Sequence, residues 1–173
     1  MYELLKKKYG QNFLIDKNIL IKISNLILKN NLKIIEIGPG DGKLTDFILK
    51  YKPKELKIIE IDNDLIPFLD LKFKDYECIT IINADVLNYD FIDKTDLIIS
   101  NLPFNISSQI LIKICLMKQP PINLILMFQK EFAQRLLDKK MNSLNALVGC
   151  FYDINFKFNI SKNCFRPIPK VDS

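Results

Sequence analysis

Leu32 to Gly42 read LKIIEIGPGDG. The apolar run predicts a buried strand that ends at Ile37, and Leu44–Tyr51 has the pattern of a following helix. Strand, glycine-rich turn and helix in this order are typical of the ligand-binding edge of a parallel α/β sheet. The spacing Gly38-x-Gly40-x-Gly42 differs from the G-x-G-x-x-G of dinucleotide folds, whose glycines admit a pyrophosphate. We therefore expect a compact ligand without phosphates, which S-adenosylmethionine fits, although an ordinary tight turn would use the same glycines.

The remaining chain continues this alternation of strands and helices, which favours an α/β fold with a mostly parallel central sheet and helices on both faces. Apolar runs predict strands at 32–37, 56–61, 78–82, 95–100, 122–128 and, by alternation, 154–160. Helices are predicted at 17–28, 44–51, 65–73, from 107 or 108 to 117, 131–140 and 144–152. Residues 164–173 are expected to be extended. No linker or repeat divides the chain, so we expect one domain over residues 1–173.

Composition restricts both the class of protein and the chemistry. The chain has 173 residues, 49% hydrophobic and 26% charged, as expected of one globular domain. No apolar run approaches the roughly 20 residues of a membrane helix, and no secretory signal is recognisable, so a cytoplasmic location is expected. The sequence contains no histidine, which excludes histidine-dependent acid–base and triad chemistry. The four cysteines lack metal-binding spacing, and no metal site is predicted.

The charge is mildly basic, with a net value of +5. Such a charge is compatible with a nucleic-acid partner without requiring one. Lys6, Lys7, Lys8 and Lys17 are candidate phosphate contacts. A solvated run of lysines is the alternative interpretation.

Carboxylates follow the second and third predicted strands. Glu60, beside Ile61, could accept hydrogen bonds from both hydroxyls of a ribose. Asp85, beside Val86, could accept one from an adenine amino group, or it could serve only as a turn or cap residue. For Asp62 or Asp64 we prefer a helix N-cap. Because ligands of open α/β sheets bind at the carboxyl ends of the strands, the succession of glycines and carboxylates indicates one site.

The fourth strand ends in Asn101-Leu102-Pro103-Phe104-Asn105. The Asn101 side-chain oxygen and the Leu102 carbonyl could both accept from a target amine, and Pro103 would stiffen the turn. Phe104 could stack on a base that has been flipped out of its helix. Phe165 could close the opposite side of such a pocket. The alternatives are a structural asparagine turn with Phe104 in the core, and Phe165 packed beneath the proline-rich tail.

Together these features predict methyl transfer to the exocyclic amine of a base. An aromatic amine is a poor nucleophile because its lone pair is delocalised into the ring. Two acceptors would favour a pyramidal nitrogen whose lone pair points at the methyl group. No strong base is needed, since a sulfonium is easily displaced and the proton can depart after transfer.

Seven segments also carry a resemblance to a known family. They are Tyr9–Leu14, Glu36–Thr45, Ile59–Asp62, Asn83–Val86, Asn101–Ser107, Gln129–Glu131 and Phe165–Ser173. In this order they resemble the ribosomal RNA adenine dimethyltransferases, in particular the type that acts on the small subunit. The resemblance spans nearly the whole chain, and the combination of segments is highly specific.

The resemblance implies a Rossmann-like class I methyltransferase fold that moves methyl groups from S-adenosylmethionine to adenine N6, twice per base. The cofactor would meet Asn12, Leu14, Gly38, Gly40, Glu60, Ile61, Asp85, Val86 and Asn101. The target adenine would be held and activated by Asn101, Leu102, Pro103 and Phe104. The family usually has tyrosine where this chain has Phe104, and phenylalanine keeps the stacking face. From the resemblance we also expect that the family's C-terminal helical domain is absent from this chain.

The resemblance predicts small-subunit ribosomal RNA, or an immature small subunit, as the partner of a monomeric enzyme. A methylase that acts on adenines of large-subunit RNA is the nearest alternative. A non-catalytic factor that binds ribosomal RNA during ribosome assembly is the alternative from another class. The glycines, Glu60, Asp85 and Asn101 argue against it, because a scaffold does not need them.

Overall fold

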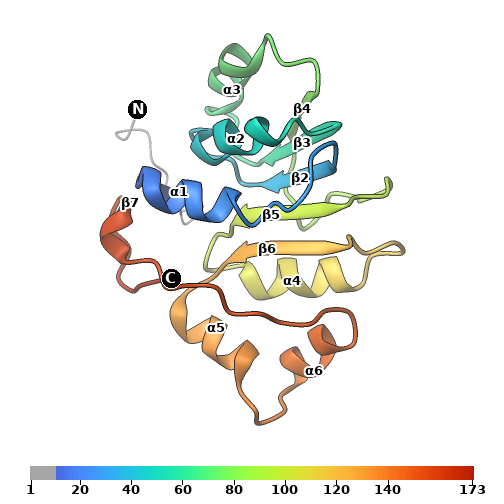
Figure 1. Ribbon diagram of the computed structural model, residues 1–173, viewed down its shortest axis with the longest axis vertical. Coiled ribbons are helices and arrows are strands. Elements are labelled where there is room, and N and C mark those ends of the chain that lie inside the picture. Colours follow the sequence, from blue (N-terminus) through green and yellow to red (C-terminus); the bar gives the residue numbers. More distant parts are fainter. Residues whose placement is uncertain (1–10) are drawn as a thin grey trace.

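The computed structural model describes residues 11–173, and its centre is a five-stranded, all-parallel sheet (Figure 1). The strand order is β4-β3-β2-β5-β6. The strands are β2 (Lys33–Ile37), β3 (Glu55–Glu60), β4 (Ile79–Asn83), β5 (Leu97–Asn101) and β6 (Asn123–Met127). The order reverses between β2 and β5, and the glycine-rich turn follows β2 at this point. The carboxyl ends at such a reversal are where open α/β sheets bind ligands.

Helices make three of the four connections between successive strands of the sheet, as expected of parallel pairing, and the connection between β4 and β5 has none. The helices are α1 (Lys17–Ser24), α2 (Lys43–Ile48), α3 (Ile66–Phe73), α4 (Ser107–Cys115), α5 (Lys130–Leu137) and α6 (Ser143–Gly149). Short 3₁₀ turns follow at Leu49–Tyr51 and Lys162–Cys164. The Asp16 carboxylate caps α1 by accepting from the backbone N–H groups of Asn18 and Ile19 at 2.8 and 3.0 Å.

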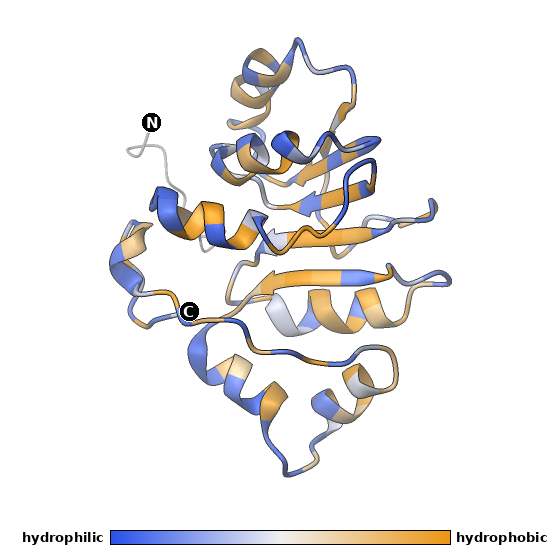
Figure 2. Ribbon diagram, viewed as in Figure 1, coloured by the Kyte–Doolittle hydropathy of each residue, from blue (hydrophilic) through white to orange (hydrophobic). Residues whose placement is uncertain are grey.

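Both faces of the sheet pack against other elements, which explains why the strands are mostly apolar (Figure 2). Successive side chains of a strand point to opposite faces. Ile34 and Ile58 accordingly pack in the core that includes α1, α2 and α3. Ile35 and Ile98 pack in a second core with α4. The predicted α/β architecture with helices on both faces is therefore confirmed.

The ends of the described chain meet in a separate two-stranded ladder. β1 (Phe13–Leu14) pairs antiparallel with β7 (Phe165–Arg166). The Ile15 N–H also donates to the Cys164 carbonyl at 2.8 Å. This pairing fixes residues 11–14, called here the strap, beside the glycine-rich loop.

Several predicted elements differ from those observed. The first helix stops at Ser24 rather than at residue 28, and the helices predicted at 131–140 and 144–152 end at Leu137 and Gly149. The segment 154–160 forms no strand, because it has no extended ladder with a neighbour. Only Ile160 is bonded in sheet-like fashion, by an exchange of two backbone hydrogen bonds with Ser173.

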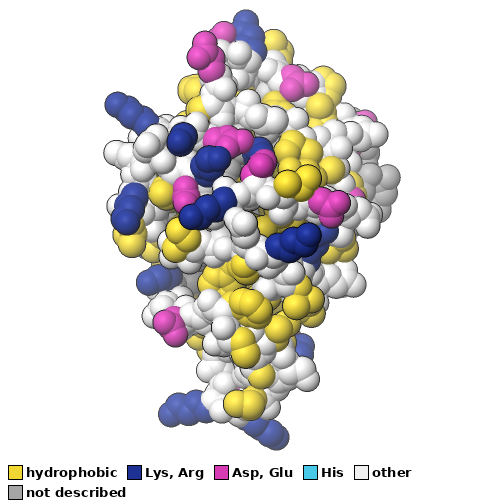
Figure 3. All heavy atoms as spheres, turned by 90° about the vertical axis from the view of Figure 1, so that its right-hand side faces the viewer, with side chains coloured by type: hydrophobic (Ala, Val, Ile, Leu, Met, Phe, Trp, Pro, Cys, Tyr) yellow, Lys and Arg dark blue, Asp and Glu magenta, His cyan; other side chains and the backbone are white. Residues whose placement is uncertain are grey.

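The amino ends of the strands form the face opposite the glycine-rich loop. Figure 3 shows this face, where charged side chains gather in the upper part and apolar ones below the middle. Within residues 11–173, no helix has the combined length and apolar character that crossing a bilayer requires. Over the same range, no group of three or more Cys, Asp or Glu side chains is arranged to hold a metal ion.

Candidate active site

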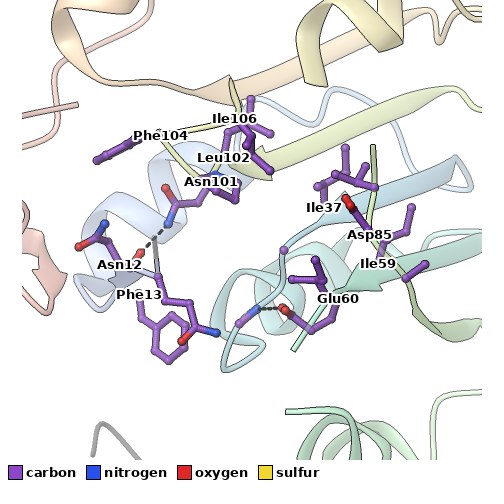
Figure 4. Close-up of a pocket in the computed structure, with 17 residues that line it drawn as sticks. Asn12, Phe13, Ile37, Ile59, Glu60, Asp85, Asn101, Leu102, Phe104 and Ile106 are labelled. Carbon is purple, nitrogen blue, oxygen red and sulfur yellow. Dashed lines mark hydrogen bonds between the residues drawn. The ribbon is translucent and has the colours of Figure 1, made fainter. Parts of the chain in front are cut away.

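A cleft opens at the carboxyl ends of β2, β3, β4 and β5 (Figure 4). In Figure 4, Asn101 and Phe104 lie on one side of the cleft and Glu60 and Asp85 on the other. The predicted residues that line it are Asn12, Gly38, Gly40, Glu60, Ile61, Asp85, Val86, Asn101, Leu102, Pro103 and Phe104.

The glycine-rich loop shapes the floor of the cleft. Gly38, Gly40 and Gly42 all have positive φ, at 64°, 59° and 70°. Gly40 also packs tightly, since an added Cβ would lie 2.7 Å from Cε1 of Phe13. The loop therefore depends on glycine both for its backbone angles and for contact with the strap.

Glu60 ends β3 and faces the loop. Its carboxylate accepts from the N–H groups of Gly40 at 3.3 Å and Asp62 at 2.9 Å. Burial raises the pKa of Glu60, and these two hydrogen bonds lower it. A carboxylate has about four acceptor positions, so two N–H groups leave capacity for the vicinal hydroxyls of a ribose. The remaining acceptor positions of Glu60 thus fit the ribose of S-adenosylmethionine.

Asp85 is a turn residue that also lies at the cleft. Its oxygens accept from the Leu87 N–H at 2.9 Å and from Nδ2 of Asn88 at 3.1 Å, which makes it a turn residue. It also lines the cleft, beside Ala84 and Val86. The turn therefore holds the Asp85 carboxylate at the cleft wall.

Asn101 is held by the strap. Its Nδ2 donates to the backbone carbonyl of Asn12 at 2.8 Å, across 89 positions of sequence. This bond uses the N–H side of the amide, so Oδ1, which can only accept, points away from the Asn12 carbonyl (Figure 4). The preceding Ser100 hydroxyl donates to the Ile37 carbonyl at 2.6 Å and joins β5 to the start of the glycine-rich loop.

The turn after Asn101 brings an aromatic ring to the cleft. The Ile106 N–H donates to the Pro103 carbonyl at 3.2 Å, and the Ser107 hydroxyl donates to the Phe104 carbonyl at the same distance. The α4 N-cap is Ile106, so neither serine predicted as a cap has that role. Phe104 is half-buried at the cleft rather than in a core cluster, which favours the stacking role over the core alternative.

Phe165 does not reach the cleft, and its predicted role at the base pocket is wrong for this structure. Its side chain is 0% exposed within the main core. The physical reason is the pairing of β7 with β1, which turns the ring inward. Burial in the main core agrees with a structural role, as the alternative interpretation had it, although the ring packs in the core.

Three other expectations need qualification. The Leu14 side chain is buried in the main core and does not line the cleft, so only its backbone could meet a cofactor there. Asp62 precedes α3 but is not its N-cap, which is Leu65. Lys17 is exposed at the start of α1. Lys6, Lys7 and Lys8 lie outside the described residues.

Sequence reasoning missed part of the cleft wall. Gln11 lines it and donates from Nε2 to Oδ2 of Asp62 at 2.8 Å, which joins the strap to the end of β3. Ile37, Ile59 and Ile106 supply apolar surface. The position of Ile37 and Ile59 at strand ends, next to Gly38 and Glu60, was the signal that could have identified these two.

Glu36 lies beneath the glycine-rich loop and is 1% exposed. The Thr45 hydroxyl, from α2, donates to its Oε2 at 2.6 Å. Burial raises the pKa of Glu36 to about 8, partly opposed by the Thr45 hydrogen bond and the nearby charge of Lys72. Glu36 therefore joins β2 to α2 mainly as a neutral carboxylic acid at neutral pH.

Glu36→Gln is expected to reduce the loss of stability as the pH rises. In the unfolded chain the carboxyl ionises near pH 4.5, whereas in the folded protein it keeps its proton to about pH 8. Its stabilising effect is complete below pH 4.5 and is lost toward pH 8, at roughly 1.4 kcal/mol per pH unit. Urea unfolding at about pH 6 and about pH 7.5 should show a drop larger by about 2 kcal/mol in wild type than in the variant. Equal drops would show that Glu36 is ionised in the fold.

Comparison with known proteins agrees with this geometry. The family model described as ribosomal RNA adenine dimethylase matches residues 3–173. The chain belongs to the ribosomal RNA adenine dimethylase family. Proteins named ribosomal RNA small subunit methyltransferase A are 41% identical in Mycoplasmopsis pulmonis and in Pelagibacter ubique. The alignments cover 97% and 100% of this chain but 68% and 69% of those relatives, so the chain spans about two thirds of their length.

Two solved structures share the fold over most of this chain. A dimethyladenosine transferase from Plasmodium falciparum superposes with a TM-score of 0.82 at 31% identity, covering 92% of this chain and 60% of that one. The 23S rRNA methyltransferase ErmE gives the same TM-score at 25% identity, covering 92% and 66%. These findings confirm the class I methyltransferase fold, the enzyme class and the predicted cofactor, S-adenosylmethionine.

Proposed function

We propose that this chain transfers methyl groups from S-adenosylmethionine to the N6 amine of adenines in small-subunit ribosomal RNA, twice per base. The observation that carries the proposal is the position of Asn101, which shares one cleft with Glu60 and the glycine-rich loop. The strap connects the two sides, because Gln11 bonds Asp62 and the Asn12 carbonyl accepts from Asn101.

The residues that would hold the cofactor are those of the loop side of the cleft. Glu60 would accept from the ribose hydroxyls and Asp85 from the adenine amino group, while Ile61 and Val86 would contact the rings. Backbone at Gly38 and in the strap would meet the amino-acid end. When bound, S-adenosylmethionine supplies an electrophilic methyl group on a cationic sulfur.

The opposite side of the cleft would prepare the target amine. In the first transfer, Oδ1 of Asn101 and the carbonyl of Leu102 would each accept one N–H of adenine N6, so that the nitrogen becomes pyramidal and its lone pair is free to attack. In the second transfer the monomethylated amine has a single N–H, which one of the two acceptors would bind. The Leu102 side chain is 1% exposed, which fixes the backbone that presents this carbonyl. The proton leaves for solvent after transfer, since the cleft is open.

Phe104→Ala is expected to weaken capture of the RNA, whereas Phe104→Tyr should be nearly neutral because it keeps the stacking face. Stacking on an aromatic ring contributes roughly 1–3 kcal/mol per base, so the KM for RNA should rise between about fivefold and about a hundredfold in the alanine variant. Steady-state kinetics at saturating S-adenosylmethionine measure this. An unchanged KM in Phe104→Ala would remove Phe104 from the base pocket.

We also propose that residues 1–173 form one catalytic domain and that the enzyme acts as a monomer in the cytoplasm. Support for the single domain comes from the continuous sheet and the family match over residues 3–173. The small subunit is favoured as the target because relatives with that name are 41% identical, against 25% for ErmE.

The test mixes labelled S-adenosylmethionine with immature small subunits and, separately, with protein-free large-subunit RNA, followed by digestion to nucleosides. Labelled N6,N6-dimethyladenosine from the small subunit alone is the expected result. Label in the large-subunit RNA would support the related methylase function. Binding of cofactor and RNA without any labelled nucleoside would support the non-catalytic assembly factor.

A further inference from the structure

Lys72, on α3, contacts the far end of the glycine-rich loop. Its Nζ lies 3.0 Å from the carbonyl oxygen of Asp41, 2.9 Å from that of Gly42 and 2.8 Å from Oδ2 of Asp46. The side chain is 24% exposed. An ammonium group has three N–H donors, so this arrangement provides one oxygen for each of them.

Gly42, at the loop end that Lys72 contacts, is the N-cap residue of α2, with φ of 70°, and has no side chain to cap the helix. The neighbouring Asp41 carboxylate accepts from the Lys43 N–H at 3.2 Å. An added Cβ on Gly42 would lie 2.8 Å from the ring of Phe73, which shows that α3 packs directly against the loop. Lys72 therefore holds the carbonyl groups of Asp41 and Gly42 in place where Gly42 has a positive φ, which few residues adopt.

Lys72 lies outside the cleft, whose lining includes Gly38 and Gly40 but no residue of α3. It cannot touch a ligand there directly. Any effect on the ligand must pass through the loop, which is five residues long from Gly38 to Gly42. The Gly42 N–H donates to the Pro39 carbonyl at 2.9 Å, so the anchored end is bonded directly to the cleft end.

We propose that Lys72 is a positioning residue that holds the glycine-rich loop in its ligand-binding shape and thereby sets the affinity for the cofactor. The proposal rests on the proposed function, because it takes S-adenosylmethionine as the ligand of the loop. Charge-assisted hydrogen bonds are stronger than neutral ones, which suits a single side chain that restrains two carbonyls.

Lys72→Met keeps the apolar stem and removes the ammonium. Calorimetric titration with S-adenosylhomocysteine should give a Kd about tenfold higher than wild type, at unchanged stoichiometry. Amide hydrogen exchange of residues 38–42 in the ligand-free protein should become faster. Lys74→Met is the matched control, since Lys74 is an exposed lysine directly after α3, and it should match wild type in both measurements.

Asp46→Asn separates the ion pair from the loop anchor. It removes the charge of Asp46 but leaves both carbonyl contacts of Lys72, so the Kd should stay within about twofold of wild type. A Kd raised as much as in Lys72→Met would overturn the proposal in favour of the ion pair. An unchanged Kd in Lys72→Met, with only a lower melting temperature or a lower stoichiometry, would also overturn it. Failure of wild type to bind S-adenosylhomocysteine would contradict the proposed function together with this inference.

Discussion

Asn101→Ala is expected to slow methyl transfer by roughly a hundred- to a thousandfold, the loss typical when a preorganised polar group is removed from a reaction site. The variant lacks the Oδ1 acceptor that would make the adenine amine nucleophilic. It also loses the bond to the Asn12 carbonyl, a single hydrogen bond, so the affinity for S-adenosylhomocysteine should fall by less than about tenfold. Single-turnover methylation and calorimetric titration measure the two effects separately.

Asn105→Ala is the control for this experiment. Asn105 is the same residue type in the same turn, but it is exposed and does not line the cleft. It should keep the wild-type rate. Wild-type turnover in Asn101→Ala would show that the amine is activated in some other way, and an equal loss in both variants would indicate a general disturbance of the turn.

Gly40→Ala is expected to weaken binding of S-adenosylhomocysteine by more than about tenfold. Left-handed backbone costs a residue with a Cβ roughly 1–2 kcal/mol, and the new Cβ would collide with the Phe13 ring at 2.7 Å. Movement of Phe13 would displace the strap, including the Asn12 carbonyl that orients Asn101. It would also strain the bond from the Gly40 N–H to Glu60. Titration calorimetry gives the affinity, and thermal unfolding should show a lower midpoint.

Gly149→Ala tests whether the loss is specific to the loop. Gly149 ends α6, its φ is not in the left-handed range, and an added Cβ would meet nothing within 4 Å. Alanine is there expected to be neutral or to stabilise by about 0.5–1 kcal/mol. If Gly40→Ala bound the ligand as tightly as Gly149→Ala, the loop would not form the floor of the cofactor site.

The sequence predicted the sheet well because a strand that packs on both faces leaves a mostly apolar run. All five observed strands of the sheet fall within or next to such runs, and the polar residues at their ends, such as Glu60 and Asp85, lie at the cleft as expected. Parallel strands place their carboxyl ends together, so adjacency in space followed from alternation in sequence. Asn101 could be placed for the same reason.

Features that depend on distant pairing could not be predicted in this way. The short pairing of Phe13–Leu14 with Phe165–Arg166 leaves no periodic signal, and it decides both the position of the strap and the burial of Phe165. The segment 154–160 alternates like a strand but lacks a ladder partner, and alternation reports the faces of a strand rather than its neighbours. Lys72 resembles a solvated lysine until α3 is packed against the loop.

The most direct test of the account is a crystal structure of the protein with S-adenosylhomocysteine. The account predicts ribose hydroxyls on the Glu60 carboxylate, the adenine next to Asp85, and the sulfur directed at the space between Asn101 and Phe104. A ligand bound outside this cleft, or a sulfur directed away from the Asn101 amide, would contradict the claim that donor and acceptor meet there.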